Sequence, residues 1–225
     1  MSTRQSIINI KRKLVLVLLF VSFLIFADTF IKVPLCRQGK DYTCGIAAMQ
    51  CILAYYINNP PSQDEMAKEA KSNRASGTKY KNLQKLAENK GCKTQIYKNE
   101  KSDVAITRLK EILDDGKPVI VLIQAWREPN FIDPISGYEN DYDDGHYVVA
   151  MGYDSNNIYF MDPSTLGNYT YIPNDEFIVR WHDIDGVKQN KDNTLIHFMM
   201  VVTKEPGPVY NQDIIKDFKW DSLKN

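Results

Sequence analysis

The sequence predicts an α+β fold, with helices packed on an antiparallel sheet, because helical patterns fill the first half of the chain and strand patterns the second. The chain has 225 residues, of which 44 % are apolar and 25 % charged. This composition is ordinary for a globular protein and excludes a disordered, collagenous or disulfide-dense chain. Lys plus Arg and Asp plus Glu both number 28, so the net charge is zero. No nucleic-acid partner is expected, since such proteins normally carry a basic excess.

Four helices are expected in the first half, over about residues 44–58, 62–71, 81–90 and 103–115. The first has apolar residues at a helical period and ends before Pro60-Pro61. Ser62 and Glu65 have the spacing of a capping box at the start of the second. Gly91 and Gly116 follow the third and fourth helices and are their expected stop residues.

Four strands are expected in the second half, over residues 118–125, 146–153, 157–161 and 194–202. Each run is rich in β-branched and aromatic residues and is bounded by turn residues. A short helix over residues 173–181, with Pro173 in its first turn, is expected between the last two strands.

The N-terminus has the pattern of a targeting segment. Residues 14–27 are apolar except for Ser22, and the basic residues Lys11 to Lys13 precede them. This predicts a signal peptide or a signal anchor, and the positive-inside rule places the rest of the chain outside the cytoplasm. Cleavage after Ala27 and retention as an anchor both stay open, and membrane contact is expected only through an uncleaved segment. The expected organisation is residues 1–27 as targeting segment, 28–204 as one folded domain and 205–225 as a C-terminal tail.

Cys44 is the first candidate for chemistry, because it opens the first predicted helix and is followed by Gly45. Unpaired N–H groups and the positive end of the helix dipole favour a thiolate there, which is a nucleophile. Gln38, in the preceding loop, can donate to an oxyanion formed on a carbonyl that Cys44 attacks. The alternative for a cysteine read alone is a small buried hydrophobic residue. That alternative suits Cys51, on the same helix face, whereas Cys36 and Cys92 are either buried or bridged.

His146 and Asp162 are the second pair of candidates. His146 begins a predicted strand and Asp162 ends the next one, before Pro163. If the hairpin loop is centred on Asp154, these two residues lie directly opposite each other, close enough for the carboxylate to orient the imidazole. A two-residue turn at Ser155-Asn156 would instead place Asp162 opposite Val149 and separate the pair.

The remaining candidates fit catalysis less well. His182 is expected at an exposed end of the segment 180–183, and His197 in the middle of a strand as a hydrogen-bonded sheet residue. The acidic loop 139–144 lacks the spacing of a calcium-binding loop, and is interpreted as solvated, or as selecting basic side chains or a cation. Asn168-Tyr169-Thr170 is a glycosylation sequon, which matters only in a eukaryotic secretory pathway.

The chain resembles the bacteriocin-processing (double-glycine) peptidase family, a branch of the papain-like cysteine peptidases, over about residues 30–203. The resemblance lies in Gln38-GKDYT-Cys44-GIAAMQCILAYY, then Gly145-His146-YVVAMGYDSNNIYFM-Asp162-Pro163. The segment Tyr171-IPNDEFIVRW further resembles the stand-alone members that lack a transporter.

The resemblance implies a papain-like fold and four roles: Cys44 as nucleophile, His146 as general base and acid, Asp162 as the residue that orients it, and Gln38 as oxyanion donor. Two features depart from the transporter-fused members. Thr43 stands where those members often have Asp, and no Walker motif is present. Export coupled to leader cleavage is therefore not implied.

The sequence thus predicts an extracytoplasmic cysteine peptidase that acts on a peptide or protein substrate through Cys44, His146, Asp162 and Gln38, with no metal or organic cofactor. Two alternatives remain at this stage. An acyl transferase would pass the same Cys44 thioester to an amine or thiol. A catalytically silent binding module would keep the fold without turnover.

Overall fold

The computed structural model describes residues 28–126, 135, 137–164, 168–186, 191–210 and 214–216. The predicted targeting segment, residues 1–27, lies outside the described residues, as does most of the predicted tail. Among the described residues, none of the helices combines the length and apolarity needed to cross a bilayer.

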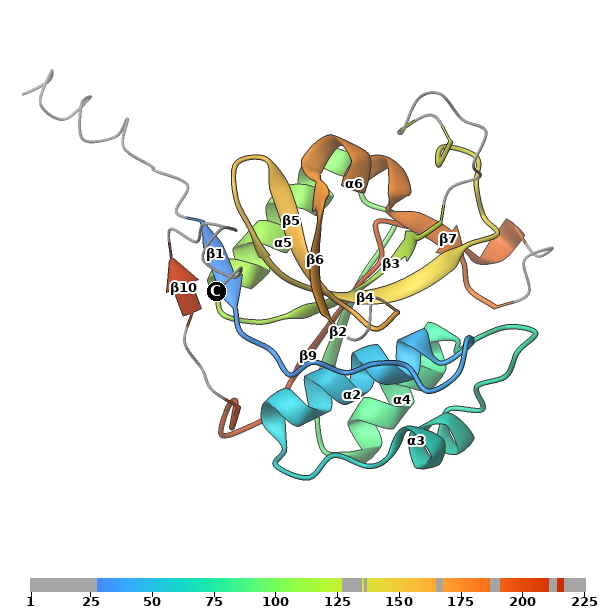
Figure 1. Ribbon diagram of the computed structural model, residues 1–225, viewed down its shortest axis with the longest axis vertical. Helices are drawn as coiled ribbons and strands as arrows, with labels where there is room; N and C mark the ends of the chain where they lie inside the picture. Colours follow the sequence, from blue (N-terminus) through green and yellow to red (C-terminus); the bar gives the residue numbers. More distant parts are fainter. Residues whose placement is uncertain are drawn as a thin grey trace, which may run out of the picture.

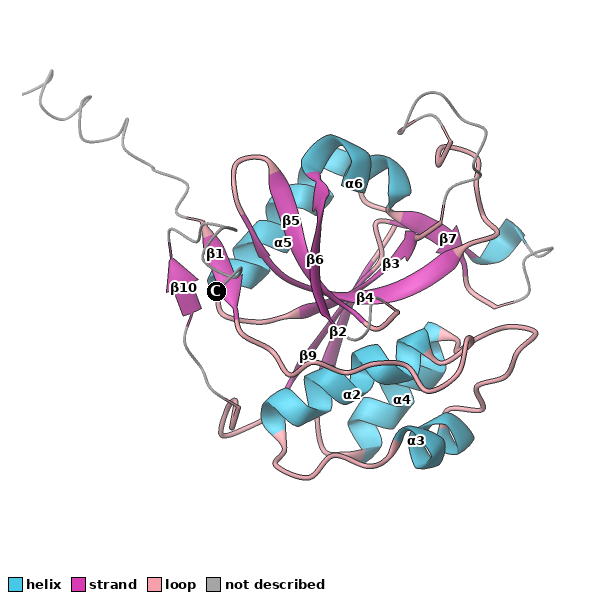
Figure 2. Cartoon of the chain, in the orientation of Figure 1, coloured by secondary structure: helices cyan, strands magenta, loops and turns pink. Residues whose placement is uncertain are grey.

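The α+β prediction is confirmed, and Figure 2 shows helices packed around a sheet of strands. The helices are α2 (Cys44–Tyr56), α3 (Gln63–Glu69), α4 (Tyr80–Asn89), α5 (Ser102–Asp114) and α6 (Asn174–Arg180). The Ser62–Glu65 capping box forms in full. Gly91 and Gly116 both have φ of 76°, the left-handed conformation that ends a helix and that glycine adopts without strain.

The strands are β1 (Thr29–Ile31), β2 (Lys93–Tyr97), β3 (Val119–Gln124), β4 (Gly145–Tyr153), β5 (Asn157–Asp162), β6 (Asn168–Pro173), β7 (His182–Ile184), β8 (Thr194–Ile196), β9 (Met199–Thr203) and β10 (Ile214–Lys216). Their main path runs β10-β1-β4-β3-β9-β2, and β5 and β6 extend from β4. All pairings in this sheet are antiparallel. In Figure 1, α2, α3 and α4 lie on one side of the sheet and α5 and α6 on the other.

The predicted strand over residues 194–202 is wrong in one respect. The segment breaks into β8 and β9 at His197, whose φ is 52°. β8 pairs with β7 in a separate two-stranded sheet, whereas β9 lies between β3 and β2. Of the elements that the sequence did not predict, β2 and β6 have exposed residues at several positions, which weakens their apolar pattern.

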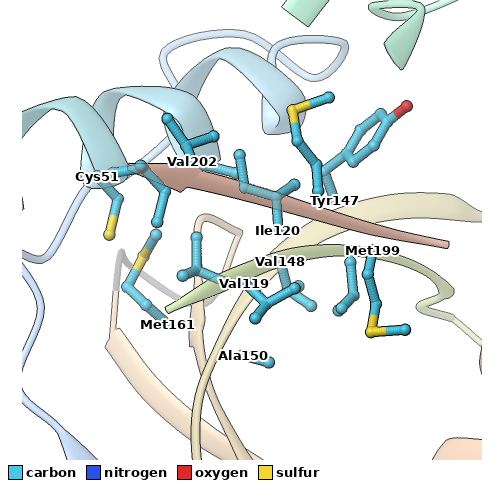
Figure 3. Packing of buried hydrophobic residues seen from close by; sticks show 14 of the residues in the cluster. Cys51, Val119, Ile120, Tyr147, Val148, Ala150, Met161, Met199 and Val202 are labelled. Atoms are coloured by element: carbon cyan, nitrogen blue, oxygen red, sulfur yellow. The ribbon is translucent and has the colours of Figure 1, made fainter. Parts of the chain in front are cut away.

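The core lies where α2 packs on the sheet, and the main helix–sheet contact in it is between α2 and β4. Most of α2 is buried, which explains why its apolar residues surround the helix instead of forming a stripe. Figure 3 shows Cys51 of α2 beside Met161 of β5, in the apolar cluster that also includes Ile120 of the sheet. The buried helix and the buried strand β4 therefore fix the relative positions of the residues at their ends.

Candidate active site

Cys44 is the first residue of α2 and is partly exposed. Thr43, just before it, forms no side-chain cap, because its hydroxyl donates instead to the backbone oxygen of Lys40 at 2.9 Å. The first-turn N–H groups and the helix dipole are therefore available to the sulfur. The backbone N–H groups of Gly45 and Tyr147 both bond to this sulfur, which favours its thiolate form.

His146 and Asp162 are brought together as predicted. His146 Nε2 lies 2.8 Å from Asp162 Oδ1, and the imidazole is 1 % exposed. Ser164, which the sequence analysis missed, donates to the same carboxylate oxygen through both its N–H and its hydroxyl, each at 2.8 Å. Nδ1 of His146 has no hydrogen-bond partner among the described residues, so it is the nitrogen left to exchange a proton with the neighbouring Cys44.

The predicted hairpin register, however, is wrong. The Asp154 N–H donates to the Asn157 oxygen at 3.0 Å, so the chain reverses through the two-residue turn Ser155–Asn156. This is the turn that was expected to separate the pair. Next to the turn, Tyr153 pairs with Ile158 and Gly152 with Tyr159.

A β-bulge corrects the register. Beyond Gly152 the pairing shifts by one residue, to Ala150 with Phe160 and Val149 with Met161, so Met151 is the inserted residue. Continued by one step, this register places Asp162 opposite Val148, two residues from His146 and on the same face of the sheet. Without the bulge, Asp162 would oppose Val149, and His146 would point to the other face.

The electrostatics favour the charged form of both Cys44 and His146. Burial raises the pKa of the Cys44 thiol, but His146 and the two backbone N–H groups outweigh it, so the pKa lies below its ordinary value. Burial lowers the pKa of His146, whereas Asp162 and Cys44 raise it, to about 9 overall. Burial likewise raises the pKa of Asp162, but His146 and Ser164 hold it well below its usual range. The lowered thiol pKa and the raised imidazole pKa both favour a thiolate–imidazolium pair beside the ionised carboxylate.

Residues 30–189 match the Peptidase_C39 like family. The chain belongs to this family. Its mixed helix and antiparallel-sheet fold is the papain-like fold of C39 peptidase structures, so the predicted fold class is confirmed. None of the curated proteins matches the chain.

Three solved structures illustrate the likeness. A putative C39-like peptidase from Bacillus anthracis is 19 % identical, with a TM-score of 0.55, over 79 % of this chain and 98 % of that one. A double glycine motif protease from an AMS/PCAT transporter, in complex with the leader peptide, is 20 % identical, with a TM-score of 0.48, over 78 % and 96 %. The peptidase domain of Streptococcus ComA is 15 % identical, with a TM-score of 0.48, over 77 % and 96 %.

In this C39-like chain, Gln38 is tied to the other half of the site through its backbone. Its N–H donates to the oxygen of Pro163, the residue after Asp162, at 3.1 Å. Its side-chain Nε2 donates to the Lys40 oxygen at 3.0 Å, and its Oε1 is buried without a partner among the described residues. The role of Gln38 as oxyanion donor thus stays a prediction. One N–H of its side-chain amide is bonded to the loop at Lys40, and the second is left to donate to an oxyanion.

Trp126 is a further residue that the sequence analysis missed. Its ring centroid lies 5.2 Å from that of His146, and the residue is 50 % exposed. The Trp126 ring thus lies against the imidazole of His146, and Asp162 is hydrogen-bonded to the same imidazole from a different direction. The available signal was a large aromatic residue just beyond the buried strand β3.

The other histidines are occupied elsewhere. The prediction of an exposed His182 is wrong: it is 6 % exposed, and its Nε2 bonds to the backbone oxygen of Asp141 at 2.8 Å, which ties down the acidic loop. His197 is buried and hydrogen-bonded as predicted, with Nδ1 2.7 Å from the Glu100 oxygen, although it lies at the strand break. No group of three or more possible metal ligands occurs in the part of the chain that the structure describes.

All four cysteines are free thiols. Cys36, Cys51 and Cys92 lie away from the imidazole. Cys51 is fully buried, as predicted, and Cys92 is 6 % exposed. Burial raises the pKa of Cys51 and of Cys92. Cys36 differs, because a hydrogen bond with Cys51 lowers its pKa. Cys44 is therefore the one thiol here that both contacts a histidine and has a lowered pKa.

Proposed function

We propose that the protein is a cysteine peptidase that hydrolyses peptide bonds, with Cys44 as nucleophile, His146 as general acid and base, and Asp162 as the residue that holds the imidazole. The observation that carries the proposal is the meeting of Cys44 at a helix start with the His146–Asp162 pair. Membership of the Peptidase_C39 like family supports it. A leader peptide bound to a structural neighbour supports a peptide substrate.

In the first half-reaction, the Cys44 thiolate forms a bond to the carbonyl carbon of the substrate, and the π electrons move to the oxygen. The Gln38 amide and the Cys44 backbone N–H donate to this oxyanion. When it collapses, the C–N bond breaks, and His146 gives its proton to the leaving amine. A thioester on Cys44 and a free amine result.

Hydrolysis of the thioester completes the cycle. His146, now neutral, accepts a proton from water as the water oxygen bonds to the acyl carbon. The carbon–sulfur bond then breaks, which releases a carboxylic acid and restores the Cys44 thiolate beside the imidazolium. Asp162 stabilises the imidazolium, which is the resting form of the ring at neutral pH.

The site of action that we propose is outside the cytoplasm, on the strength of the basic and apolar pattern of residues 11–27. Fractionation of an expressing bacterium tests this. The domain should lie across the inner membrane, as a species starting at Asp28 if the segment is cleaved. Recovery of full-length soluble protein in the cytoplasm would contradict it.

The activity is tested by incubating the protein with a peptide library, with and without an added amine, and identifying the products by mass. Hydrolysis gives paired fragments whose summed mass exceeds that of the substrate by one water. Products that carry the amine instead would favour the acyl transferase. Cys44→Ala should abolish product formation, whereas the matched Cys92→Ala, a thiol far from the imidazole, should retain it. Absence of any product with the wild type would favour the silent binding module.

A further inference from the structure

The loop that carries Gln38, residues 37–40, lies between β1 and α2 (Figure 1) and ends shortly before Cys44. This Gln38 loop is bonded to the hairpin half of the site, because the Gln38 N–H donates to the Pro163 oxygen at 3.1 Å. It is also bonded to the first turn of α3, through the side chain of Gln63. An oxyanion is stabilised well only if the loop keeps the Gln38 amide at a fixed place beside the sulfur.

The Gln63 amide bonds to the backbone on both sides of Gln38. Gln63 Nε2 donates to the Arg37 oxygen at 2.7 Å, and Gln63 Oε1 accepts from the Gly39 N–H at 2.9 Å. An amide that both donates to and accepts from one stretch of backbone makes the bonds that a neighbouring strand would make. Together with the bond from the Gln38 N–H to Pro163, these bonds involve three consecutive residues of the loop. They therefore fix the direction in which the Gln38 side chain leaves the backbone.

Gln63 also connects the Gln38 loop to the helix of the nucleophile. Its Nε2 donates to Gln50 Oε1 of α2 at 2.9 Å, and Gln50 Nε2 donates to the Pro61 oxygen, just before α3, at 3.0 Å. Gln50 and Cys44 belong to the same helix, which is largely buried, so this bond ties the loop to a rigid element. Gln63 thus sets the place of the loop relative to the helix start that carries the sulfur.

The position of Gln63 is itself well determined. It is the first residue of α3 and follows Ser62, whose capping box with Glu65 forms in full. Its side chain is partly buried. The neighbouring Asp64 reaches the same loop only through an ion pair with Lys40, in which the side chains are 83 % and 49 % exposed. Because ion pairs this exposed contribute little, the Gln63 amide provides the main bonds by which α3 holds the loop.

We propose that Gln63 is a positioning residue for catalysis, because its amide holds the Gln38 loop where Gln38 can donate to the oxygen of the carbonyl that Cys44 attacks. The inference rests on the proposed function, in which Gln38 makes that bond. Gln63 acts through Gln38 and not on the substrate, since both of its side-chain N–H groups already bond to the protein. A loop that shifts weakens a bond made in the transition state, so turnover falls while substrate binding is kept.

Gln63→Met tests the proposal, since Met keeps the length and the helix propensity of the side chain but has no amide. The substrate is a library peptide that the wild type cleaves. The value of kcat should fall about 10- to 10²-fold, the size of effect that a small misplacement of a reacting group produces, and KM should stay nearly unchanged. Iodoacetamide labelling of Cys44 near pH 6 should keep its wild-type rate, because the thiolate depends on the helix start and His146. Parallel loss of labelling and turnover would show a general structural role instead and overturn the proposal.

The matched control is Gln84→Met on α4. Gln84 is likewise partly buried, and its Nε2 also makes two hydrogen bonds, to Glu88 Oε1 and Thr94 Oγ1, each at 3.1 Å. The control should keep the wild-type kcat, because these bonds do not reach the Gln38 loop. Equal kcat values for Gln63→Met and Gln84→Met would overturn the positioning role.

A double variant separates positioning from independent effects. If Gln63 acts only through Gln38, then Gln38→Ala/Gln63→Met should turn over as fast as Gln38→Ala alone, because no donor is left to position. Losses that multiply in the double variant contradict the proposal. Failure of the proposed function gives different results: the wild type cleaves no library peptide, or Gln38→Ala alone keeps the wild-type kcat. If Gln38→Ala loses turnover and Gln63→Met does not, only the positioning role is overturned.

Discussion

The two halves of the candidate site are built in different ways. The nucleophile half, residues 38–56, is a loop followed by a helix, and the reactivity of Cys44 depends on its place at the start of α2. The hairpin half, residues 145–162, depends on the pairing of β4 with β5. One inserted residue in this pairing determines whether His146 and Asp162 lie on the same face of the sheet. Local structure thus places the sulfur at a helix start, and long-range pairing supplies the imidazole that lowers the pKa of the thiol further.

This difference implies different sensitivities to mutation. The helix start tolerates small changes in packing, because its N–H groups are part of the backbone. The hairpin tolerates fewer, since a slip of one residue moves every side chain to the opposite face. The four predictions below separate the contributions of the two halves.

Removal of the imidazole should have the largest effect. His146→Ala removes the imidazole from the partly buried Asp162 carboxylate and takes the base from the thiol. Peptide turnover should fall at least about 10⁴-fold, as expected when one member of such a catalytic unit is lost. Iodoacetamide labelling of Cys44 near pH 6 should slow as well, because the pKa of the thiol rises. If labelling stays as fast as in the wild type, the helix start alone sets the thiolate.

Gln38→Ala should reduce turnover by about 10²–10³ if the amide donates to the oxyanion, because such a bond acts mainly in the transition state. Labelling of Cys44 should persist, since the thiolate depends on the helix start and His146. The measurement is the alkylation rate beside peptide turnover in the same variant. Parallel loss of both, with a lower Tm, would show that the Gln38 side chain only holds its loop through its bond to the Lys40 oxygen.

Asp162→Asn should reduce turnover by roughly 10- to 10³-fold, less than the approximately 10⁴-fold cost of the same change in a serine-protease triad, because the Cys44 thiolate forms before substrate binds. The pH profile gives a second readout. The His146 pKa of about 9 predicts that wild-type activity falls as pH rises through this value, since the leaving amine then lacks its proton donor. Without the carboxylate the pKa of His146 falls, and this alkaline limb should move to lower pH. An unmoved limb would point to another group as its origin.

Gly152→Ala should have the smallest effect on chemistry and a measurable one on stability. A Cβ at Gly152 would lie 2.3 Å from the Thr29 backbone oxygen, so β1 must shift at the bulge. Such crowding costs about 1–3 kcal/mol, or a Tm lower by roughly 2–4 °C per kcal/mol. The matched control Gly39→Ala, whose added Cβ would come no closer than 3.6 Å to its neighbours, should leave Tm nearly unchanged. Equal Tm values for the two variants would show that the bulge has room to adapt.

Much of the fold could be predicted from the sequence, because its signals are local. The capping residues Ser62 and Glu65 and the stop glycines mark helix ends within one turn. Buried strands such as β3 are continuous apolar runs. The break at His197 and the weakly patterned strand β2 could not be predicted, since both depend on partners far along the chain.

The sequence by itself determined that Cys44 opens a helix, that His146 begins a strand and that Asp162 ends the next, because each position follows from residues within a few places of it. Only the tertiary structure decided that they meet. The tight turn at Ser155–Asn156 separates His146 from Asp162, and the bulge at Met151, where β1 packs against Gly152, restores them to one face. Which residues face each other across two paired strands depends on the number of residues between them. A single inserted residue is not visible in the local sequence pattern, yet it determines whether the imidazole and its carboxylate share a face.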